Sequence, residues 1–192
     1  MDDLADLRTP AALPAILART EALGFPMPSE PRTGAMLRVL AASKPGGRLL
    51  ELGTGTGLAT AWLLDGMDGD ARLVTVDSDP AVQAVAREML GDDKRLEIVT
   101  QDAARFLAGQ TASSFDLIFA DAMPGKYERL EEALALVRPG GLYVIDDMLP
   151  QSNWPEAHAA NVPRLLAELA AHADLHIVSM AWSSGLVVAV RH

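Results

Sequence analysis

Short apolar runs alternate with amphipathic stretches along most of the chain. Five apolar runs have the length and composition of buried strands, and a stretch with helical periodicity follows each of them. The predicted strands are residues 48–52, 72–77, 95–102, 115–122 and 140–147. Two further helices are predicted before them, at about 11–23 and 32–43, because the three prolines of GFPMPSEPR interrupt the helical pattern. This alternation indicates a mainly parallel sheet with helices on both faces.

The end of the chain does not follow this alternation of strands and helices. After a helix predicted at about 156–172, the runs LHIVSM and GLVVAVR are separated by only a short turn. Two such strands can pair only in antiparallel fashion, because a parallel return needs a crossover of about a dozen residues. We therefore expect an α/β, Rossmann-like sheet of seven strands whose last strand is antiparallel. The expected organisation is a single domain over 1–192, with 1–44 as a helical cap and 45–192 as the core.

Composition and charge disfavour several classes of function. The 192 residues carry a formal net charge of -10, which disfavours binding to nucleic acid or to an anionic membrane surface. The absence of cysteine removes disulfides, thiolate metal sites and thiol nucleophiles. The start, MDDLADLRTP, lacks the features of a secretory signal, and no apolar stretch approaches the ~18 residues of a membrane span. We expect a cytoplasmic protein with no membrane or nucleic-acid partner.

Three glycines at alternate positions, Gly53, Gly55 and Gly57, follow the first predicted strand. A dinucleotide fingerprint would need a third glycine where Leu58 or Thr60 stands, and a phosphate loop would need a following lysine. Glycine lets the backbone approach a ligand closely and adopt unusual dihedral angles. The turn is therefore predicted to bind a ligand other than a dinucleotide.

Preceded by Glu51, this glycine spacing resembles motif I of class I S-adenosylmethionine-dependent methyltransferases. The resemblance extends from about residue 28 to 191, through LVTVDSDP, VTQDAARFL, FDLIFADA and LVRPGGLYVIDDML. It implies S-adenosyl-L-methionine as cofactor, with Asp77 at the ribose hydroxyls and Asp102 near the adenine amino group. An NAD site would also use an acidic residue at the position of Asp77, so this residue alone does not distinguish an S-adenosylmethionine site from an NAD site. The implied cofactor-binding residues are Glu51, Gly53, Gly55, Gly57, Asp77, Ser78, Asp102, Ala103 and Asp121.

Within that class, the chain is most similar to the cation-dependent O-methyltransferases, which include catechol and caffeoyl-CoA-type enzymes. The upstream MPSEPRTGAMLRVLA supports this, because Gly34, with Met36 and Leu37, matches the glycine and helix that cap the cofactor in that family. The resemblance implies methylation of a small, hydroxylated, aromatic acceptor.

Three aspartates, Asp121, Asp146 and Asp147, end the fourth and fifth predicted strands. The carboxyl ends of parallel strands line the ligand crevice of such a sheet, where converging carboxylates repel one another unless a cation lies among them. All-oxygen ligands favour a hard cation such as Mg²⁺ or Ca²⁺. The resemblance assigns all three as metal ligands, whereas one or two of them could instead cap a turn or a helix.

The chain departs from the family pattern at two positions. Asp147 stands where the family has asparagine as its last metal ligand. The family's lysine, three residues after the first metal-binding aspartate, is replaced here by Pro124, and Lys126 lies two positions later, before Tyr127. The resemblance assigns Lys126 and Asp121 to catalysis, although Lys126 could instead be a solvated loop residue.

Several other residues are weaker candidates. His158 could reach the mouth of a substrate site, Trp154 could stack on a flat substrate or seal the core, and Trp182 could line the pocket or a dimer contact. An apolar face on the N-terminal helices would suit a homodimer. Four alternatives stay open: a tRNA-modifying methyltransferase, a metal-independent methyltransferase, a non-catalytic S-adenosylmethionine-binding module and a nicotinamide-dependent oxidoreductase.

Overall fold

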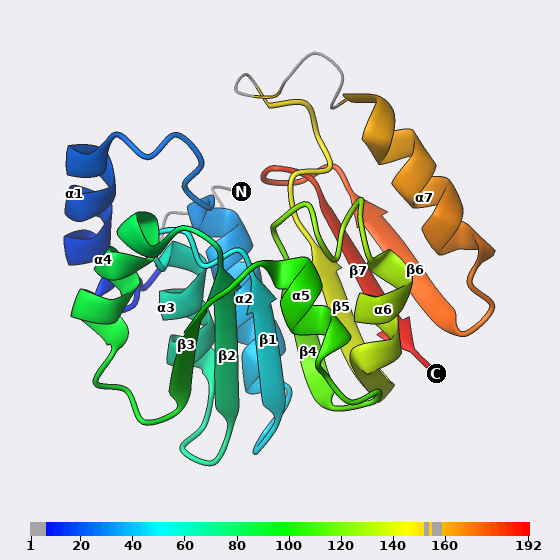
Figure 1. The fold of residues 1–192 in the computed structure, drawn as a ribbon, viewed down its shortest axis with the longest axis horizontal. Helices are drawn as coiled ribbons and strands as arrows, with labels where there is room; N and C mark the ends of the chain where they lie inside the picture. Colours follow the sequence, from blue (N-terminus) through cyan, green and yellow to red (C-terminus); the bar gives the residue numbers. More distant parts are fainter. Residues whose placement is uncertain (1–6, 152–153, 155–158) are drawn as a thin grey trace.

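The computed structural model describes residues 7–151, 154 and 159–192, and it contains a seven-stranded sheet with helices on both faces (Figure 1). The strands are β1 (Arg48–Leu52), β2 (Arg72–Asp77), β3 (Leu96–Thr100), β4 (Phe115–Ala120), β5 (Val137–Ile145), β6 (Leu175–Met180) and β7 (Leu186–Arg191). The helices are α1 (Leu13–Leu23), α2 (Pro31–Ala42), α3 (Leu58–Gly66), α4 (Pro80–Leu90), α5 (Ala103–Ala108), α6 (Leu130–Leu136) and α7 (Asn161–Ala171). Among the residues described, no helix is long and apolar enough to cross a membrane.

The strand order in the sheet is β3-β2-β1-β4-β5-β7-β6. Strands β1 to β5 pair in parallel, whereas β7 pairs antiparallel with both β5 and β6. The short turn between β6 and β7 contains Ser183 and Gly185, both with positive φ. The predicted Rossmann-like architecture, with seven strands and an antiparallel last strand, is confirmed.

Successive residues of a strand belong to two separate hydrophobic cores, one on each face of the sheet. Leu49 packs with α1 to α4 on one face of the sheet, and its neighbour Leu50 packs with α5 to α7 on the other. Leu117 and Ile118 divide in the same way. Because side chains alternate across a strand, an apolar run is buried on both sides only when helices cover both faces. Figure 1 shows these two helical layers.

Strand β5 differs from its predicted bounds. It begins at Val137, three residues before the prediction, and ends at Ile145. The early start follows an irregularity in its pairing with β4, where the register shifts between Phe115 and Leu117. Because β5 ends at Ile145, Asp146 and Asp147 lie beyond the strand, and the backbone N–H of Asp146 still donates to the carbonyl of Ala120 at 3.3 Å.

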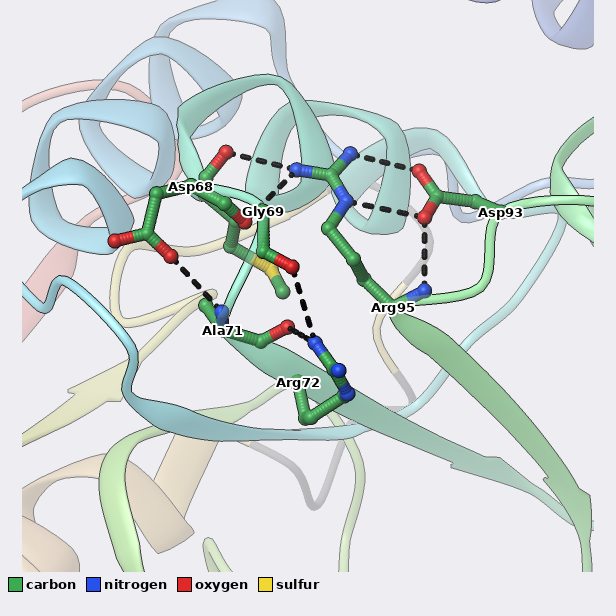
Figure 2. A network of polar contacts seen from close by, with 7 residues as sticks. Asp68, Gly69, Ala71, Arg72, Asp93 and Arg95 are labelled. Carbon is green, nitrogen blue, oxygen red and sulfur yellow. Dashed lines mark hydrogen bonds and ion pairs between the residues drawn. The ribbon is translucent and has the colours of Figure 1, made fainter.

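A network of charged groups fastens two loops at the amino-terminal end of the sheet (Figure 2). Arg95 donates to the carboxylate of Asp93 at 2.7 Å and to the carbonyl of Met67 at 2.7 Å. The carboxylate of Asp68 accepts from the backbone N–H of Ala71 at 2.8 Å. The guanidinium of Arg95 also holds the pKa of Asp93 below its ordinary value. These contacts tie the start of β2 to the start of β3, at the opposite end of the sheet from their carboxyl termini.

Gly34 lies inside α2 and faces the ring of Trp62 in α3. A Cβ atom at this position would overlap the indole, which is buried in the core. The glycine thus allows the close approach of two helices.

We expect Gly34→Ala to lower the free energy of unfolding by about 1–2 kcal/mol. Overpacking costs about 1–3 kcal/mol, which exceeds the gain of up to about 1 kcal/mol from the better helix former. Urea denaturation of the two proteins measures the difference. Gly69→Ala is the matched control, since nothing lies within 4 Å of a Cβ there. Equal losses in the two variants would contradict the packing role of Gly34.

Candidate functional site

A cavity of about 680 Å³ lies at the carboxyl ends of the parallel strands. Open α/β sheets bind ligands at this edge. The cavity is lined by most of the predicted cofactor residues: Gly53, Gly55, Asp77, Ser78, Asp102, Ala103 and Asp121. The predicted catalytic and metal residues Lys126, Asp146 and Asp147 line the same space. Glu51 and Gly57 are not part of the lining.

The backbone of the glycine turn has a conformation that residues with a side chain adopt only with strain. Gly53, Gly55 and Gly57 all have positive φ. A Cβ atom on Gly53 would lie 2.5 Å from the carbonyl oxygen of Asp121, so this glycine permits close contact between the ends of β1 and β4. A Cβ atom on Gly57 would lie 2.8 Å from the Cβ of Ala86 in α4. Gly57 therefore serves helix packing, whereas Gly53 and Gly55 shape the cavity wall.

Two of the predicted cofactor acids also hold the loops that form the site. Asp77 accepts from the backbone N–H of Gly55 at 2.8 Å and from that of Asp79 at 3.0 Å. Asp102 is the N-cap of α5 and accepts from the N–H of Arg105 at 2.9 Å. Each carboxylate therefore positions its own turn while lining the cavity.

Glu51 lies behind the glycine turn. It is fully buried, and its Oε2 accepts from Thr60 at 2.5 Å and from Thr75 at 2.6 Å. Its Oε1 has no hydrogen-bond partner in the described part of the chain. Burial raises the pKa of this carboxyl to about 7. Glu51 therefore supports the turn from inside the core, since it is absent from the cavity lining.

The three aspartates after β4 and β5 have different surroundings. Burial, followed by the charge of Asp146, raises the pKa of Asp121 well above its ordinary value. Asp146 is buried, and its Oδ1 accepts from the hydroxyl of Ser184 and from the N–H of Asp147 at 2.7 Å. Burial raises the pKa of Asp146 to about 6. Asp147 is partly exposed and has a left-handed backbone with φ 56°.

The predicted metal ligands, Asp121, Asp146 and Asp147, all line the cavity. Carboxylates are suitable ligands for a hard cation. Over the residues that the structure describes, however, no group of three or more His, Cys, Asp or Glu side chains could hold a metal ion. Asp146 directs one oxygen to Ser184 and to the backbone of Asp147. Asp121, Asp146 and Asp147 as ligands of a divalent cation therefore stay a prediction.

Lys126 is a buried residue of the cavity wall, so its alternative interpretation as a solvated loop lysine is wrong. Only 4% of its surface is exposed, and its amine lies 5.5 Å from the centre of the Tyr127 ring. Its charge counteracts the rise in the pKa of both Asp121 and Asp146. The preceding loop turns through Gly125, which has φ 89°. This path brings Lys126 to the aspartates despite its shifted position in the sequence.

The remaining walls come from the N-terminal segment, which the resemblance implies as a cap over the cofactor, and from the end of the chain. The connection between α1 and α2 contributes Phe25 to Glu30, and the β6–β7 turn contributes Ser184. Ser184 belongs to the short turn predicted between the last two strands, and no sequence motif marks it as a site residue. Trp154 lines the cavity, as one of its two interpretations expected, whereas Trp182 is absent from the lining. His158 lies outside the described residues.

Known proteins resemble this chain in sequence and in fold. The sequence model of a family described as "Methyltransferase domain" matches residues 50–148. A suggested O-methyltransferase from Mycolicibacterium vanbaalenii is 34% identical over 120 residues, which cover 60% of this chain and 53% of that protein. The chain thus spans about half the length of the curated relatives that it matches.

Two solved structures show the same fold over nearly the whole chain. The O-methyltransferase TomG from Streptomyces achromogenes, in complex with S-adenosylmethionine, has a TM-score of 0.81 and 25% identity, covering 97% of this chain and 92% of its own. A suggested O-methyltransferase from Klebsiella pneumoniae has a TM-score of 0.82 and 26% identity, covering 98% of this chain and 93% of its own. Because the family model spans more than half of the residues and includes the glycine turn and the aspartates, the chain belongs to the methyltransferase domain family.

Proposed function

We propose that the protein is an S-adenosylmethionine-dependent O-methyltransferase that acts on a small, hydroxylated, aromatic acceptor. The observation that carries this proposal is one cavity that joins the glycine turn of a methyltransferase domain to Lys126 and the aspartates. The complex of TomG with S-adenosylmethionine supports the cofactor. The acidic walls also suit the positive charge of its sulfonium.

The wall of the cavity combines apolar side chains with polar groups. Met27, Met123 and Trp154 line it, and they offer flat or flexible apolar contact to an aromatic ring. In the reaction, the acceptor oxygen forms a bond to the methyl carbon while the carbon–sulfur bond breaks and sulfur keeps the electron pair. The O–H proton passes to Asp121, and the ammonium of Lys126 stabilises the negative charge that develops on the oxygen.

The metal-independent form of this reaction has support from two observations. Asp146 is engaged by Ser184 and by the backbone of Asp147, and Lys126 already supplies a positive charge beside the aspartates. The divalent cation implied by the resemblance stays a prediction, and we assign it no step. Single-turnover methyl transfer separates an enzyme from a non-catalytic binding module.

Calorimetric titration with S-adenosylhomocysteine tests the cofactor. We expect micromolar binding to the unmodified protein and about 10- to 100-fold weaker binding to Asp77→Asn, because hydrogen bonds to charged groups are worth about 1.5–3 kcal/mol. Asp92→Asn, at an exposed position outside the cavity lining, is the control with the same loss of charge and should bind normally. Absence of binding to the unmodified protein would refute the proposed function.

A further inference from the structure

A buried chain of hydrogen bonds connects α4 to the glycine turn. Gln83 of α4 is fully buried, and its Nε2 donates to the hydroxyl of Thr54 in the turn at 3.0 Å. The hydroxyl of Thr54 lies 2.7 Å from that of Thr75, which donates to Glu51 at 2.6 Å. Thr54 lines the cavity, whereas Gln83 does not. The chain therefore connects the cavity wall to a side chain that lies behind it.

The direction of the hydrogen bonds in this chain follows from the chemistry of the groups. A carbonyl oxygen only accepts, so the atom of Gln83 that lies 3.0 Å from the carbonyl of Val99 is the amide nitrogen. The same nitrogen therefore donates to Thr54. Because Thr75 gives its single proton to Glu51, Thr54 in turn donates to Thr75.

The amide oxygen of Gln83 is engaged on the opposite side. Arg87 carries only donors, and its Nη2 lies 3.1 Å from this oxygen. The hydroxyl of Thr100 also donates to it, at 2.6 Å. The amide thus has partners at both ends, and a flipped amide would place its nitrogen against the donors of Arg87. Gln83 can therefore take only one orientation.

The glycine turn depends on anchors of this kind, because Gly53, Gly55 and Gly57 allow its backbone many conformations. The carbonyl of Thr54 accepts from the N–H of Gly57 at 2.9 Å, while its hydroxyl is held by Gln83. Threonine is branched at Cβ and has restricted χ1 rotation, so a fixed hydroxyl also fixes the backbone that carries it. Gln83 thereby orders the residues that border the cavity.

We propose that Gln83 is a positioning residue for the cofactor and orders the glycine turn through Thr54 before S-adenosylmethionine binds. The proposal rests on the proposed function and adds to it a residue of α4 that no cofactor motif marks. A ligand that meets an ordered turn loses no affinity to ordering it, so the anchor strengthens binding without touching the ligand. Ordering the backbone of one residue corresponds to about 5- to 30-fold in affinity.

Calorimetric titration of Gln83→Met with S-adenosylhomocysteine measures this effect. Methionine keeps the length of the side chain and removes its hydrogen bonds. We expect the variant to bind the nucleoside about 5- to 30-fold more weakly than the unmodified protein. KM for S-adenosylmethionine should rise by a similar factor, whereas kcat should stay within about twofold, because the bound cofactor itself orders the turn. Unchanged affinity, or an effect on kcat alone, would overturn the proposal.

Two further variants separate the two ends of the amide. Gln83→Glu keeps the oxygen that accepts from Arg87 and Thr100 but replaces Nε2 by an acceptor, so it should weaken binding as much as Gln83→Met. Arg87→Met is the matched control, since Arg87 is exposed and its loss leaves both hydrogen bonds of Nε2 in place. It should bind the nucleoside within about twofold of the unmodified protein. An equal loss in Arg87→Met would contradict an anchor that acts at the turn.

A double-mutant cycle tests whether Gln83 acts through Thr54. Thr54→Val removes the hydroxyl that accepts from Gln83. In its absence, Gln83→Met should cause little further loss of affinity, so the two losses should not add. Thr54→Ser keeps the hydroxyl and should bind within about threefold of the unmodified protein. Additive losses would show that Gln83 supports the fold without acting on the turn.

Amide hydrogen exchange of the free protein, followed by NMR, separates this proposal from the proposed function. The N–H groups of Gly55 and Gly57 donate to Asp77 and Thr54, so their exchange rates report the order of the turn. Both should exchange about 5- to 30-fold faster in Gln83→Met than in the unmodified protein.

The two measurements can fail separately. If the unmodified protein does not bind S-adenosylhomocysteine, the methyltransferase assignment is refuted, while hydrogen exchange still decides whether Gln83 orders the turn. If the nucleoside binds and exchange in Gln83→Met is unchanged, the proposed function stands and the positioning role of Gln83 is overturned.

Discussion

Replacing Lys126 with methionine is expected to lower kcat/KM for methyl transfer by about 10²- to 10³-fold. Removal of one group that stabilises a developing oxyanion has an effect of this size. Methionine keeps most of the buried volume, so the change removes mainly the charge of a side chain that is 4% exposed. Without this charge, the negative charge on the acceptor oxygen would develop beside Asp121 and Asp146 with no cation to compensate it.

Steady-state kinetics together with titration of S-adenosylhomocysteine distinguish a catalytic effect from misfolding. The nucleoside should bind to Lys126→Met with an affinity within about threefold of the unmodified protein, because the residues at the carboxyl ends of β1 and β2 are untouched. Lys94→Met, at an exposed position outside the cavity lining, is the matched control. The unmodified enzyme should retain its rate after treatment with EDTA. Loss of that rate, restored by Mg²⁺, would show that a metal ion supplies the charge that we assign to Lys126.

The fold could be predicted largely because its signals are local. Apolar runs that alternate with amphipathic helices fix a parallel sheet, and the short turn between β6 and β7 fixes the antiparallel ending. The start of β5 escaped prediction, since Val137 joins the strand through a register shift against β4. Such a shift depends on pairing between distant residues.

The same distinction applies to the site. The spacing from Gly53 to Gly55 and the place of Asp77 at a strand end are local features, and both residues line the cavity. The partner of Asp146 is Ser184, which lies 38 residues later in the chain, and no spacing rule connects them. The sequence could therefore bring three aspartates to one edge of the sheet, but it could not show that Asp146 turns toward a serine.

Lys126 lines the cavity although its spacing in the sequence differs from the family pattern. The family position is occupied by Pro124, yet the turn through Gly125 returns a lysine to the same cavity. The hydroxyl of Tyr143 donates to the carbonyl of Gly125 and helps to hold this turn. A pattern that counts residues misses such a substitution, because the loop path is set by contacts with β5.

The stability of the protein without cofactor should depend strongly on the protonation of Glu51. Its pKa rises from an ordinary value of 4.5 to about 7, chiefly because of burial, while Thr60 and Thr75 oppose the rise and the charge of Asp77 adds to it. A carboxyl with a higher pKa in the folded state binds its proton more tightly when folded. Its contribution is therefore complete below pH 4.5 and is lost as the pH rises through about 7. This rise in pKa corresponds to about 3 kcal/mol of unfolding free energy.

Glu51→Gln should remove this dependence, because glutamine does not titrate. Urea denaturation at intervals from pH 4.5 to 8 measures the free energy of unfolding as a function of pH. Over this range, the free energy of unfolding of the variant should fall by about 3 kcal/mol less than that of the unmodified protein. Asp121 and Asp146 also have raised pKa values and titrate in both proteins. The charge of Glu51 is the smallest of the causes that raise the pKa of Asp121, so the difference between the curves reports chiefly on Glu51. Glutamine places an amide group where Oε1 of Glu51 has no hydrogen-bond partner in the described chain. This replacement changes the free energy of unfolding by an amount that does not vary with pH. Glu21→Gln, at an exposed position of α1, should give a curve parallel to that of the unmodified protein. If the Glu51 variant is parallel as well, Glu51 is ionised in the folded protein, and the acidic group behind the glycine turn carries a full charge.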